Sequence, residues 1–477
     1  MQKRGAAAGP PTQPEGLSME ISARAPRPVR PPPKFVSGPL LSHILVMTGT
    51  GGLGLVAIFL GDLANILFLS WLGDEAVVAA VGYGSSILFF TVSIGIGLSI
   101  AATSLVSPAI GAGHRVKARR LSVNAHLATF AASSILALAV WLAVPWLLAL
   151  LGASGRTHAL ATGYLLILVP SLPPLALAIT SSAVLRSVGD ARRAMHVTLA
   201  GAAVNVILDP IFIFGFGLGI DGAAIASFLA RLVVMVVGLW GVIRVHTLMG
   251  RPRLRPFLAD APALAAIAAP AVLTNMATPV ANAYVTAAIA PFGDSAVAGW
   301  AIIGRIMPVA FGAIYALSGS IGPIVGQNWG AGNGERMRHA LTLSLAVTAA
   351  FTAAAWIALV VLASPLVQLF QATGEAAQLI VLFCRWLAPL FGFLGALFVA
   401  NAVFNTLRRP HYSTILNWGR ATIGTIPFVE AGSALAGAKG VLAGSMLGAI
   451  VFGALAVCLC YRLINSLAAE GDAAGRP

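Results

Sequence analysis

The stretch VNVILDPIFIFGFGLGIDGAA, residues 204–224, places an aspartate inside a segment that is otherwise apolar enough to span a membrane. A charge near the middle of a bilayer costs roughly 3 kcal/mol on insertion scales, so intramembrane acids usually face a cavity and mark an ion or substrate pathway. Asn205 lies four positions before Asp209, which on a helix puts its amide on the same face as the carboxylate. Pro210 has no N–H to offer the preceding turn, so the carbonyl of Val206 is free to line a polar site. The stretch therefore predicts a functional site within the membrane.

The composition is that of a polytopic membrane protein. Of the 477 residues, 58% are hydrophobic and 9% are charged, and the mean hydropathy is +0.91, far from the range of soluble globular proteins. The net charge of +14 falls mostly in short loops on one side of the predicted membrane, so it indicates topology and not nucleic-acid binding. The sequence shows no nucleophile with a base and no metal-ligand spacing, so we expect neither an enzyme nor a bound metal or cofactor.

Twelve apolar stretches follow Leu40, each near or above the ~20 residues that a spanning helix needs. They cover residues 41–72, 77–109, 121–151, 159–186, 194–218, 222–245, 262–291, 296–328, 340–370, 376–407, 412–436 and 440–465. One set of alternate loops is rich in arginine and the other holds most of the loop acids. This asymmetry predicts that both termini are cytoplasmic, in the inner membrane of a cell.

The two halves of the chain resemble each other. LGDEAVVAAVG at 72–82 is similar to FGDSAVAGWAI at 292–302, and SPAIGAGHRVKARR at 107–120 is similar to GQNWGAGNGERMRH at 326–339. The fold class predicted is an all-α polytopic membrane protein of twelve transmembrane helices, in two six-helix bundles related by pseudo-twofold symmetry. The domains predicted are a disordered cytoplasmic tail at 1–37, an N-lobe at 38–245, a cytoplasmic linker at 246–261, a C-lobe at 262–466 and a cytoplasmic tail at 467–477.

Asp62 is a second acid within an apolar stretch, and Asn65 lies close to it. Eleven residues separate Asp62 from Gly73, which is about 17 Å along a helix, and Asp209 lies roughly 15 Å from the same surface. Two carboxyls at one depth could share a proton, because desolvation and like charge both favour the neutral acid. Asp62, Asn205 and Asp209 are therefore the expected coupling residues for H⁺, with Na⁺ as the alternative, since carboxylate and amide oxygens can bind either ion.

Other polar residues within the predicted spans leave the substrate open. Arg231 lies at a similar depth and could instead form a structural ion pair with either aspartate. Asn65, Asn282 and Arg305 are candidates for the substrate cavity; Asn282 stands eleven residues before Gly293, where the first half has Asp62. If Arg305 and Arg385 line the cavity, an anionic substrate becomes plausible.

Taken together, these motifs resemble the multidrug and toxic compound extrusion (MATE) family of transporters. The resemblance covers about residues 38–466 and rests on D-x-x-x-x-L-F-L-x-x-L-G at 62–73, GAG-x-x-x-K-A-R-R at 111–120, LRSVGDARRAM at 185–195, the Asn205 and Asp209-Pro210 stretch, and GQNWGAG at 326–332. It implies two six-helix bundles forming a V around a central cavity. Asp62, Asn205 and Asp209 look like the proton-coupling cluster of the branch related to DNA-damage-inducible transporters. The other branch has acids in the seventh and tenth helices, which are missing here.

The resemblance and the buried acids predict a secondary antiporter that exports organic cations or drugs in exchange for protons or sodium by alternating access. The alternative is a flippase or exporter of an anionic or lipid-linked substrate of the same superfamily. The expected partners are a small, cationic and amphipathic substrate and the lipid bilayer, with no nucleic acid, and the expected oligomeric state is a monomer.

Overall fold

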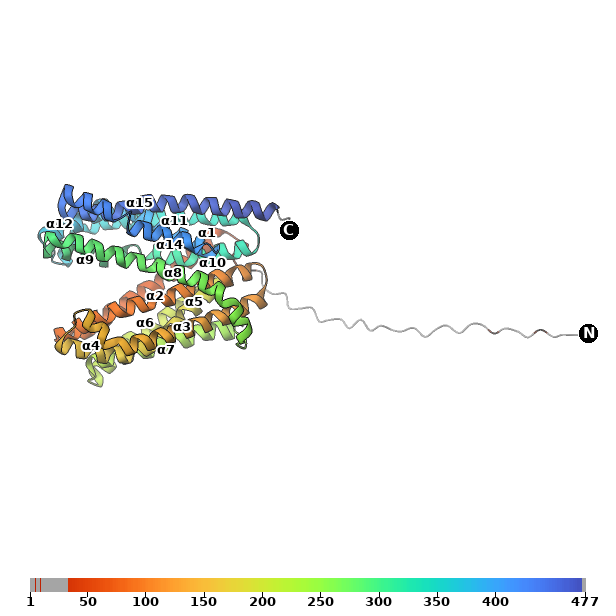
Figure 1. The fold of residues 1–477 in the computed structure, drawn as a ribbon, viewed down its shortest axis with the longest axis horizontal. Helices are drawn as coiled ribbons and strands as arrows, with labels where there is room; N and C mark the ends of the chain where they lie inside the picture. The colour runs from red at the N-terminus through yellow and green to blue at the C-terminus, as the bar shows by residue number, and fades with distance from the viewer. Residues whose placement is uncertain (1–4, 6–8, 10–32, 474–477) are drawn as a thin grey trace, which may run out of the picture. The chain divides into compact units, whose positions relative to one another are not determined.

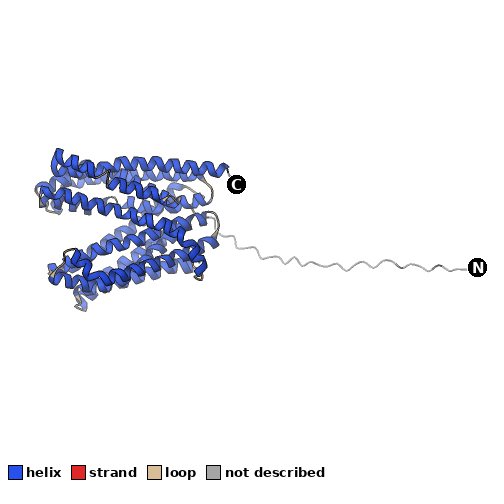
Figure 2. Ribbon diagram, viewed as in Figure 1, coloured by secondary structure: helices blue, strands red, loops and turns tan. Residues whose placement is uncertain are grey.

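The computed structural model describes residues 5, 9 and 33–473, and in 33–473 every regular element is a helix (Figure 2). The α-helices are α1 (Leu40–Ser70), α2 (Glu75–Gly111), α3 (Arg115–Leu150), α4 (Gly155–Leu168), α5 (Leu172–Ser187), α6 (Ala191–Pro210), α7 (Gly219–Trp240), α8 (Leu254–Ile289), α9 (Asp294–Ala310), α10 (Gly312–Gly330), α11 (Gly334–Leu369), α12 (Gly374–Leu382), α13 (Phe391–Thr406), α14 (Pro410–Ala421) and α15 (Ile426–Ala473). Short 3-10 or π-helical segments adjoin several of them: η1 (Val169–Ser171), η2 (Ile211–Gly215), η3 (Gly241–Val245), η4 (Ala290–Phe292), η5 (Phe383–Leu387) and η6 (Ala388–Leu390).

These helices make twelve membrane crossings, as the sequence predicts. Ten helical stretches are long and apolar enough to span a bilayer, and α9 with α10, bent by 51°, form a further one. One of the ten, Pro410–Glu470, has 61 residues and breaks at Ala436 and Gly437, where Gly437 has a φ of +58°. The chain folds back at this break, so the stretch contains two crossings. The protein is therefore an all-α, multi-pass membrane protein.

Glycines let the last two crossings pack backbone against backbone. A β-carbon on Gly440 would lie 1.8 Å from the carbonyl oxygen of Gly432, and a β-carbon on Gly448 would lie 1.8 Å from the carbonyl oxygen of Gly424. Small residues allow close helix approach in membranes, where van der Waals packing drives helix association. The glycines of α15 are thus required by the hairpin itself.

We expect Gly440→Val to destabilise the protein by roughly 3 kcal/mol or more, because the added atoms would meet backbone that cannot move aside. The measurement is the midpoint of thermal unfolding in detergent. Gly319→Val is the matched control, since Gly319 is also helical but nothing lies within 4 Å of the position that a β-carbon would take there. Equal falls of the unfolding midpoint in the two variants would contradict the close backbone packing at Gly440.

The helices form two bundles, with α2 to α7 in one and α8 to α15 in the other (Figure 1). Helix α1 packs against both α6 and α10, and α2 packs against both α8 and α10. The predicted N-lobe at 38–245 includes α1, so one helix of this predicted lobe has neighbours in both bundles. We call α1 to α7 the first half and α8 to α15 the second half.

A reciprocal contact relates the two halves. A β-carbon on Gly111 would lie 1.9 Å from the carbonyl oxygen of Gln327, and a β-carbon on Gly330 would lie 1.9 Å from the carbonyl oxygen of Pro108. Gly111 and Gly330 are equivalent in the sequence repeat, and each meets the residue three positions before the other. Such an exchange of equivalent contacts is what a twofold relation produces. It also explains why both copies of the GAG turn begin with glycine.

The loops 112–114, 188–190, 246–253, 331–333 and 407–409 lie at one end of the bundles, which we call the arginine-rich end. The predicted tail at 1–37 falls mostly on residues 1–4, 6–8 and 10–32, outside the described part of the chain. Its last residues, 33–37, are instead folded against the arginine-rich end, where Phe35 is 1% exposed. The predicted tail at 467–477 also begins as helix, because α15 continues to Ala473. Residues 474–477 are not among those described.

Candidate functional site

Asp209 lies near the end of α6 and is fully buried, with 0% of its surface exposed. Asn65 of α1 donates a hydrogen bond from Nδ2 to Oδ2 of Asp209 at 2.9 Å. The other carboxylate oxygen, Oδ1, is buried and has no hydrogen-bond partner among the described residues. Leaving a buried acceptor unpaired costs about 1–3 kcal/mol, and more when the group is charged. The carboxyl group is therefore suited to taking up a proton or a cation at Oδ1.

Asn205 adds a second oxygen of the same kind. Its Oδ1 atom is also buried and has no partner within the described part of the chain. Asn205 and Asp209 are four residues apart on α6, so they share a face of the helix. A protonated carboxyl can donate to an amide oxygen, and a hard cation can be bound by both oxygens.

Asp62 is not directly paired with Asp209. It lies one turn before Asn65 on α1 and its side chain is exposed, whereas that of Asp209 is buried. The two predicted acids therefore have different surroundings, and Asn65 is the side chain that reaches the carboxylate of α6. The sequence predicts Asn65 as a cavity residue, and in the structure Asn65 is hydrogen-bonded to Asp209.

Arg231, the possible ion-pair partner of the two aspartates, forms no salt bridge with either of them in the described part of the chain. Arg231 of α7 instead donates from Nη1 to the hydroxyl of Ser171 at 2.9 Å. The serine follows α4 and supplies a neutral acceptor, so neither carboxylate is neutralised by this arginine through an ion pair.

The remaining candidates lie in the second half and do not join the Asp209 group through hydrogen bonds. Asn282 on α8 and Arg305 on α9 both have exposed side chains. Arg385, in η5, is exposed as well. Arg420 of α14 is 7% exposed and donates to the hydroxyl of Thr278 at 3.1 Å. Three of these four side chains in the second half thus carry a guanidinium group.

The two halves meet in a junction at the arginine-rich end, which the sequence did not predict. The backbone N–H of Phe35 donates to Oε1 of Gln327 at 2.9 Å, and Nε2 of Gln327 donates to the carbonyl oxygen of Ser187 at 2.7 Å. The carbonyl oxygen of Phe35 accepts bonds from Asn328 and Arg336, each at 3.1 Å.

Gln327, which is fully buried, therefore connects α5 of the first half, α10 of the second half and the segment before α1. Lys34 adds a bond from Nζ to the carbonyl oxygen of Gly189 at 2.8 Å. Phe35 belongs to one apolar cluster with Ala191 of α6 and Ile324 of α10. The two halves are thus joined at this end of the bundles. The polar run Gln327-Asn328 inside an apolar helix was the available sequence signal.

A charged network fixes the loops of the first half at the same end. Asp190 caps α6 by accepting from the backbone N–H of Arg193 at 3.1 Å, and its Oδ2 also contacts Nη1 of Arg193 and, at 2.8 Å, Nε2 of His246. Burial alone would raise the pKa of Asp190, but the bonds from His246 and Arg193 outweigh it and hold this pKa well below its usual range. The carboxylate is therefore ionised at neutral pH.

A carboxyl group whose pKa falls on folding stabilises the fold above its unfolded pKa of about 3.9 and loses this effect as the pH falls toward the folded value. We expect Asp190→Asn, which keeps a capping side chain, to lower the thermal unfolding midpoint at pH 7. The difference from wild type should shrink below about pH 4. Asp190→Ala should cost about 1 kcal/mol more, because it also removes the cap. A pH-independent difference between wild type and the asparagine variant would contradict this account.

Two repeated helical bundles, twelve crossings and polar groups within the spans are the architecture typical of secondary transporters. The MatE family model matches residues 52–211 and 270–429, one copy in each half, and the chain belongs to this family of transporters. The structural resemblance agrees, since a crystal structure of the Vibrio cholerae MATE transporter VcmN in the bent form has a TM-score of 0.84 and 27% identity, covering 90% of this chain and 98% of that one.

Two relatives carry more specific names. A protein of Shewanella oneidensis named FAD transporter is 32% identical over 445 residues, which are 91% of this chain and 97% of its own length. The multidrug export protein MepA of Staphylococcus aureus is 23% identical over 431 residues, which are 89% of this chain and 93% of its own length. MATE proteins are transporters and not enzymes, and they use ion gradients in place of bound cofactors to move small molecules across membranes. The more specific branch related to DNA-damage-inducible transporters stays a prediction.

Proposed function

We propose that this protein is a proton-coupled antiporter in which Asp209 and Asn205 form the coupling site, supported by Asn65 and Asp62. The observation that carries the proposal is the pair of buried oxygens, Oδ1 of Asp209 and Oδ1 of Asn205, which have no donor among the described residues and lie on one helix face. A proton on Asp209 would give the carboxyl group a donor to offer and remove its buried charge. Sodium is the alternative coupling ion, because oxygens are also its preferred ligands.

Alternating access would use the junction at the arginine-rich end. The positive-inside rule makes this end cytoplasmic, with both termini on the same side of the inner membrane. With this orientation, the bonds of Gln327 to Phe35 and Ser187 would join the two halves on the cytoplasmic side. In this mechanism, protons from outside reach Asp209 in this state, and breaking the junction exposes the site to the cytoplasm. Coupling requires that proton and substrate favour different states.

For the substrate, we propose an organic cation of the drug type. The exposed carboxylate of Asp62 and the buried carboxyl of Asp209 attract a cation when deprotonated, and protonation would release it. The multidrug export relatives support this substrate class.

A second candidate is an anionic substrate bearing phosphate groups, such as a flavin dinucleotide. The name of the Shewanella oneidensis relative favours it, as do the guanidinium groups of Arg305, Arg385 and Arg420 in the second half. In this case the cation-binding role of the aspartates would be limited to the coupling ion.

Uptake into inside-out vesicles separates these possibilities. Ethidium and FAD are supplied in parallel, and each is tested under a pH gradient alone, a sodium gradient alone and no gradient. The proposal expects ethidium accumulation driven by the pH gradient. Accumulation of FAD without ethidium would overturn the cationic substrate, and accumulation driven by sodium alone would overturn proton coupling.

A further inference from the structure

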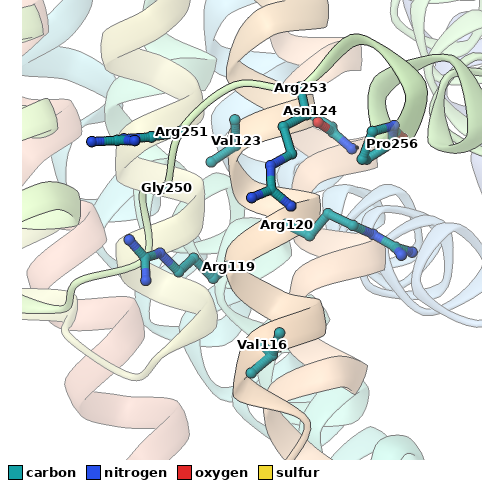
Figure 3. A pocket seen from close by; sticks show the side chains of 9 residues that line it. All are labelled: Val116, Arg119, Arg120, Val123, Asn124, Gly250, Arg251, Arg253 and Pro256. Carbon is teal, nitrogen blue, oxygen red and sulfur yellow. Dashed lines mark hydrogen bonds between the residues drawn. The ribbon is translucent and has the colours of Figure 1, made fainter.

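A pocket of about 530 Å³ opens at the arginine-rich end, between α3 and the linker that joins the two halves. Arg119, Arg120 and Asn124 line it from α3, and Arg251 and Arg253 line it from the linker, close to the start of α8 (Figure 3). The linker is held in place by α3, because Nε of Arg119 donates to the carbonyl oxygen of Met249 at 2.7 Å. The pocket walls are therefore fixed by contacts within the protein.

The charges in the pocket do not balance. Asp260 of α8 is 9% exposed and is bound by Arg120, with Nε to Oδ2 at 3.0 Å, and by Nδ2 of Asn124 at 2.7 Å. This carboxylate offsets one arginine. Within the part of the chain that the structure describes, no carboxylate pairs with Arg119, Arg251 or Arg253. The pocket thus carries an excess of about three positive charges, which favours an anion with several oxygens.

The helix ends around the pocket add to this potential. Helices α3 and α8 both begin there, and neither has an acidic residue in its first turn. The N-terminal end of a helix carries a partial positive charge that an anion stabilises. Here arginines surround each helix end instead. A bound anion would therefore offset both the positive helix ends and the positive charge of the arginines.

Exposed apolar side chains lie close in sequence to the basic residues of the pocket. Val116 lines the pocket and is 84% exposed, while Leu254 and Leu258 at the start of α8 are 70% and 58% exposed. Apolar side chains next to a basic pocket suit a ligand with a phosphate head and hydrocarbon chains. Basic pockets on the cytoplasmic side of transmembrane helices bind the head groups of anionic lipids.

We propose that this pocket binds the phosphate head group of an anionic phospholipid, with Arg251 and Arg253 as its main ligands and Arg119 beside them. The lipid bridges α3 and the linker, and its acyl chains run past Leu254 and Leu258 into the bilayer. A soluble phosphate ion has the same charged group but no hydrocarbon chain that could contact Leu254 and Leu258.

The test titrates the full-length protein in detergent with short-chain phosphatidylglycerol, short-chain phosphatidylcholine and inorganic phosphate, and follows bound lipid by native mass spectrometry and heat by calorimetry. We expect phosphatidylglycerol to bind more tightly than the other two ligands. In the Arg251→Gln/Arg253→Gln variant its affinity should fall roughly twentyfold, since each arginine near an anionic lipid contributes about fivefold.

The matched control is Arg338→Gln/Arg409→Gln, which removes two exposed arginines at the same end of the second half, one in the first turns of α11 and one just before α14. It should leave the affinity for phosphatidylglycerol within about twofold of wild type. Equal losses in both double variants would overturn the pocket as the site. Binding of inorganic phosphate as tight as that of phosphatidylglycerol would overturn the lipid and identify a soluble anion. A photoreactive phosphatidylglycerol provides the second readout, and labelling that avoids residues 248–258 would also overturn the proposal.

Discussion

Asp209→Asn is expected to reduce export driven by a pH gradient by roughly ten- to a hundredfold, the range of a coupling free energy of about 1–3 kcal/mol. The amide has nearly the shape of the carboxyl group and can still accept the bond from Asn65, so the fold should remain intact. What it cannot do is gain and lose a proton. The measurement is dye transport by proteoliposomes under an imposed pH gradient, with the transport rate at zero gradient recorded for the same preparation.

Two further variants make this prediction specific. Asp62→Asn should lose less, because the Asp62 carboxylate is exposed and does not contact Asp209 through a hydrogen bond among the described residues. Asp294→Asn removes an acid at the end of the bundles opposite the arginine-rich end, and this variant should transport dye like wild type. An Asp209→Asn protein that exports dye at the wild-type rate, with the same dependence on the pH gradient, would exclude Asp209 from coupling.

The fold was largely predictable because its main determinants are local or periodic. A run of about twenty apolar residues is enough to predict a crossing, and the paired GAG turns predict the repeat. The reciprocal contact of Gly111 and Gly330 shows the physical basis of that repeat, since both turns need glycine for the same backbone approach. The short helical breaks, such as the bend between α9 and α10, depend on packing and could not be predicted from hydropathy.

The site was predictable only where its residues share one helix. Asn205 and Asp209 are four residues apart, so helical periodicity alone brings them to one face. Asn65 is 144 residues from Asp209, and no sequence period relates α1 to α6, so the bond between them depends on the tertiary fold. Asp62 appeared equivalent to Asp209 because depth along a helix can be counted, whereas the direction of its side chain cannot.

Phe35 shows the same limit at the arginine-rich end. It follows a proline-rich stretch with few large apolar residues, which is a composition typical of a disordered tail. Its burial depends on Gln327, which is 292 residues away in the chain. A composition average over the tail cannot detect one apolar side chain that has a partner so distant in sequence.

Removing the Phe35 side chain is expected to open the junction between the two halves. Phe35 is 1% exposed and contacts both halves through one apolar cluster, and truncating a buried phenylalanine costs about 3–5 kcal/mol. A bias of about 5.5 kcal/mol is enough to move a two-state equilibrium from 1:99 to 99:1, so Phe35→Ala should shift much of the population away from the state described here. Gln327→Ala should act in the same direction, because it removes the bonds to Phe35 and Ser187.

The reporter for this opening is a cysteine in place of Ser187, which is fully buried at the junction, in a background without Cys384, Cys458 and Cys460. Its labelling rate with a water-soluble maleimide should rise at least tenfold in Phe35→Ala, because losing the buried ring shifts the equilibrium toward the state in which the junction is open. Phe383→Ala is the matched control: that phenylalanine is 0% exposed but lies in a cluster confined to the second half. Because both variants lose a buried ring, general destabilisation would raise labelling in both, whereas a junction between the halves predicts a rise in the Phe35 variant alone.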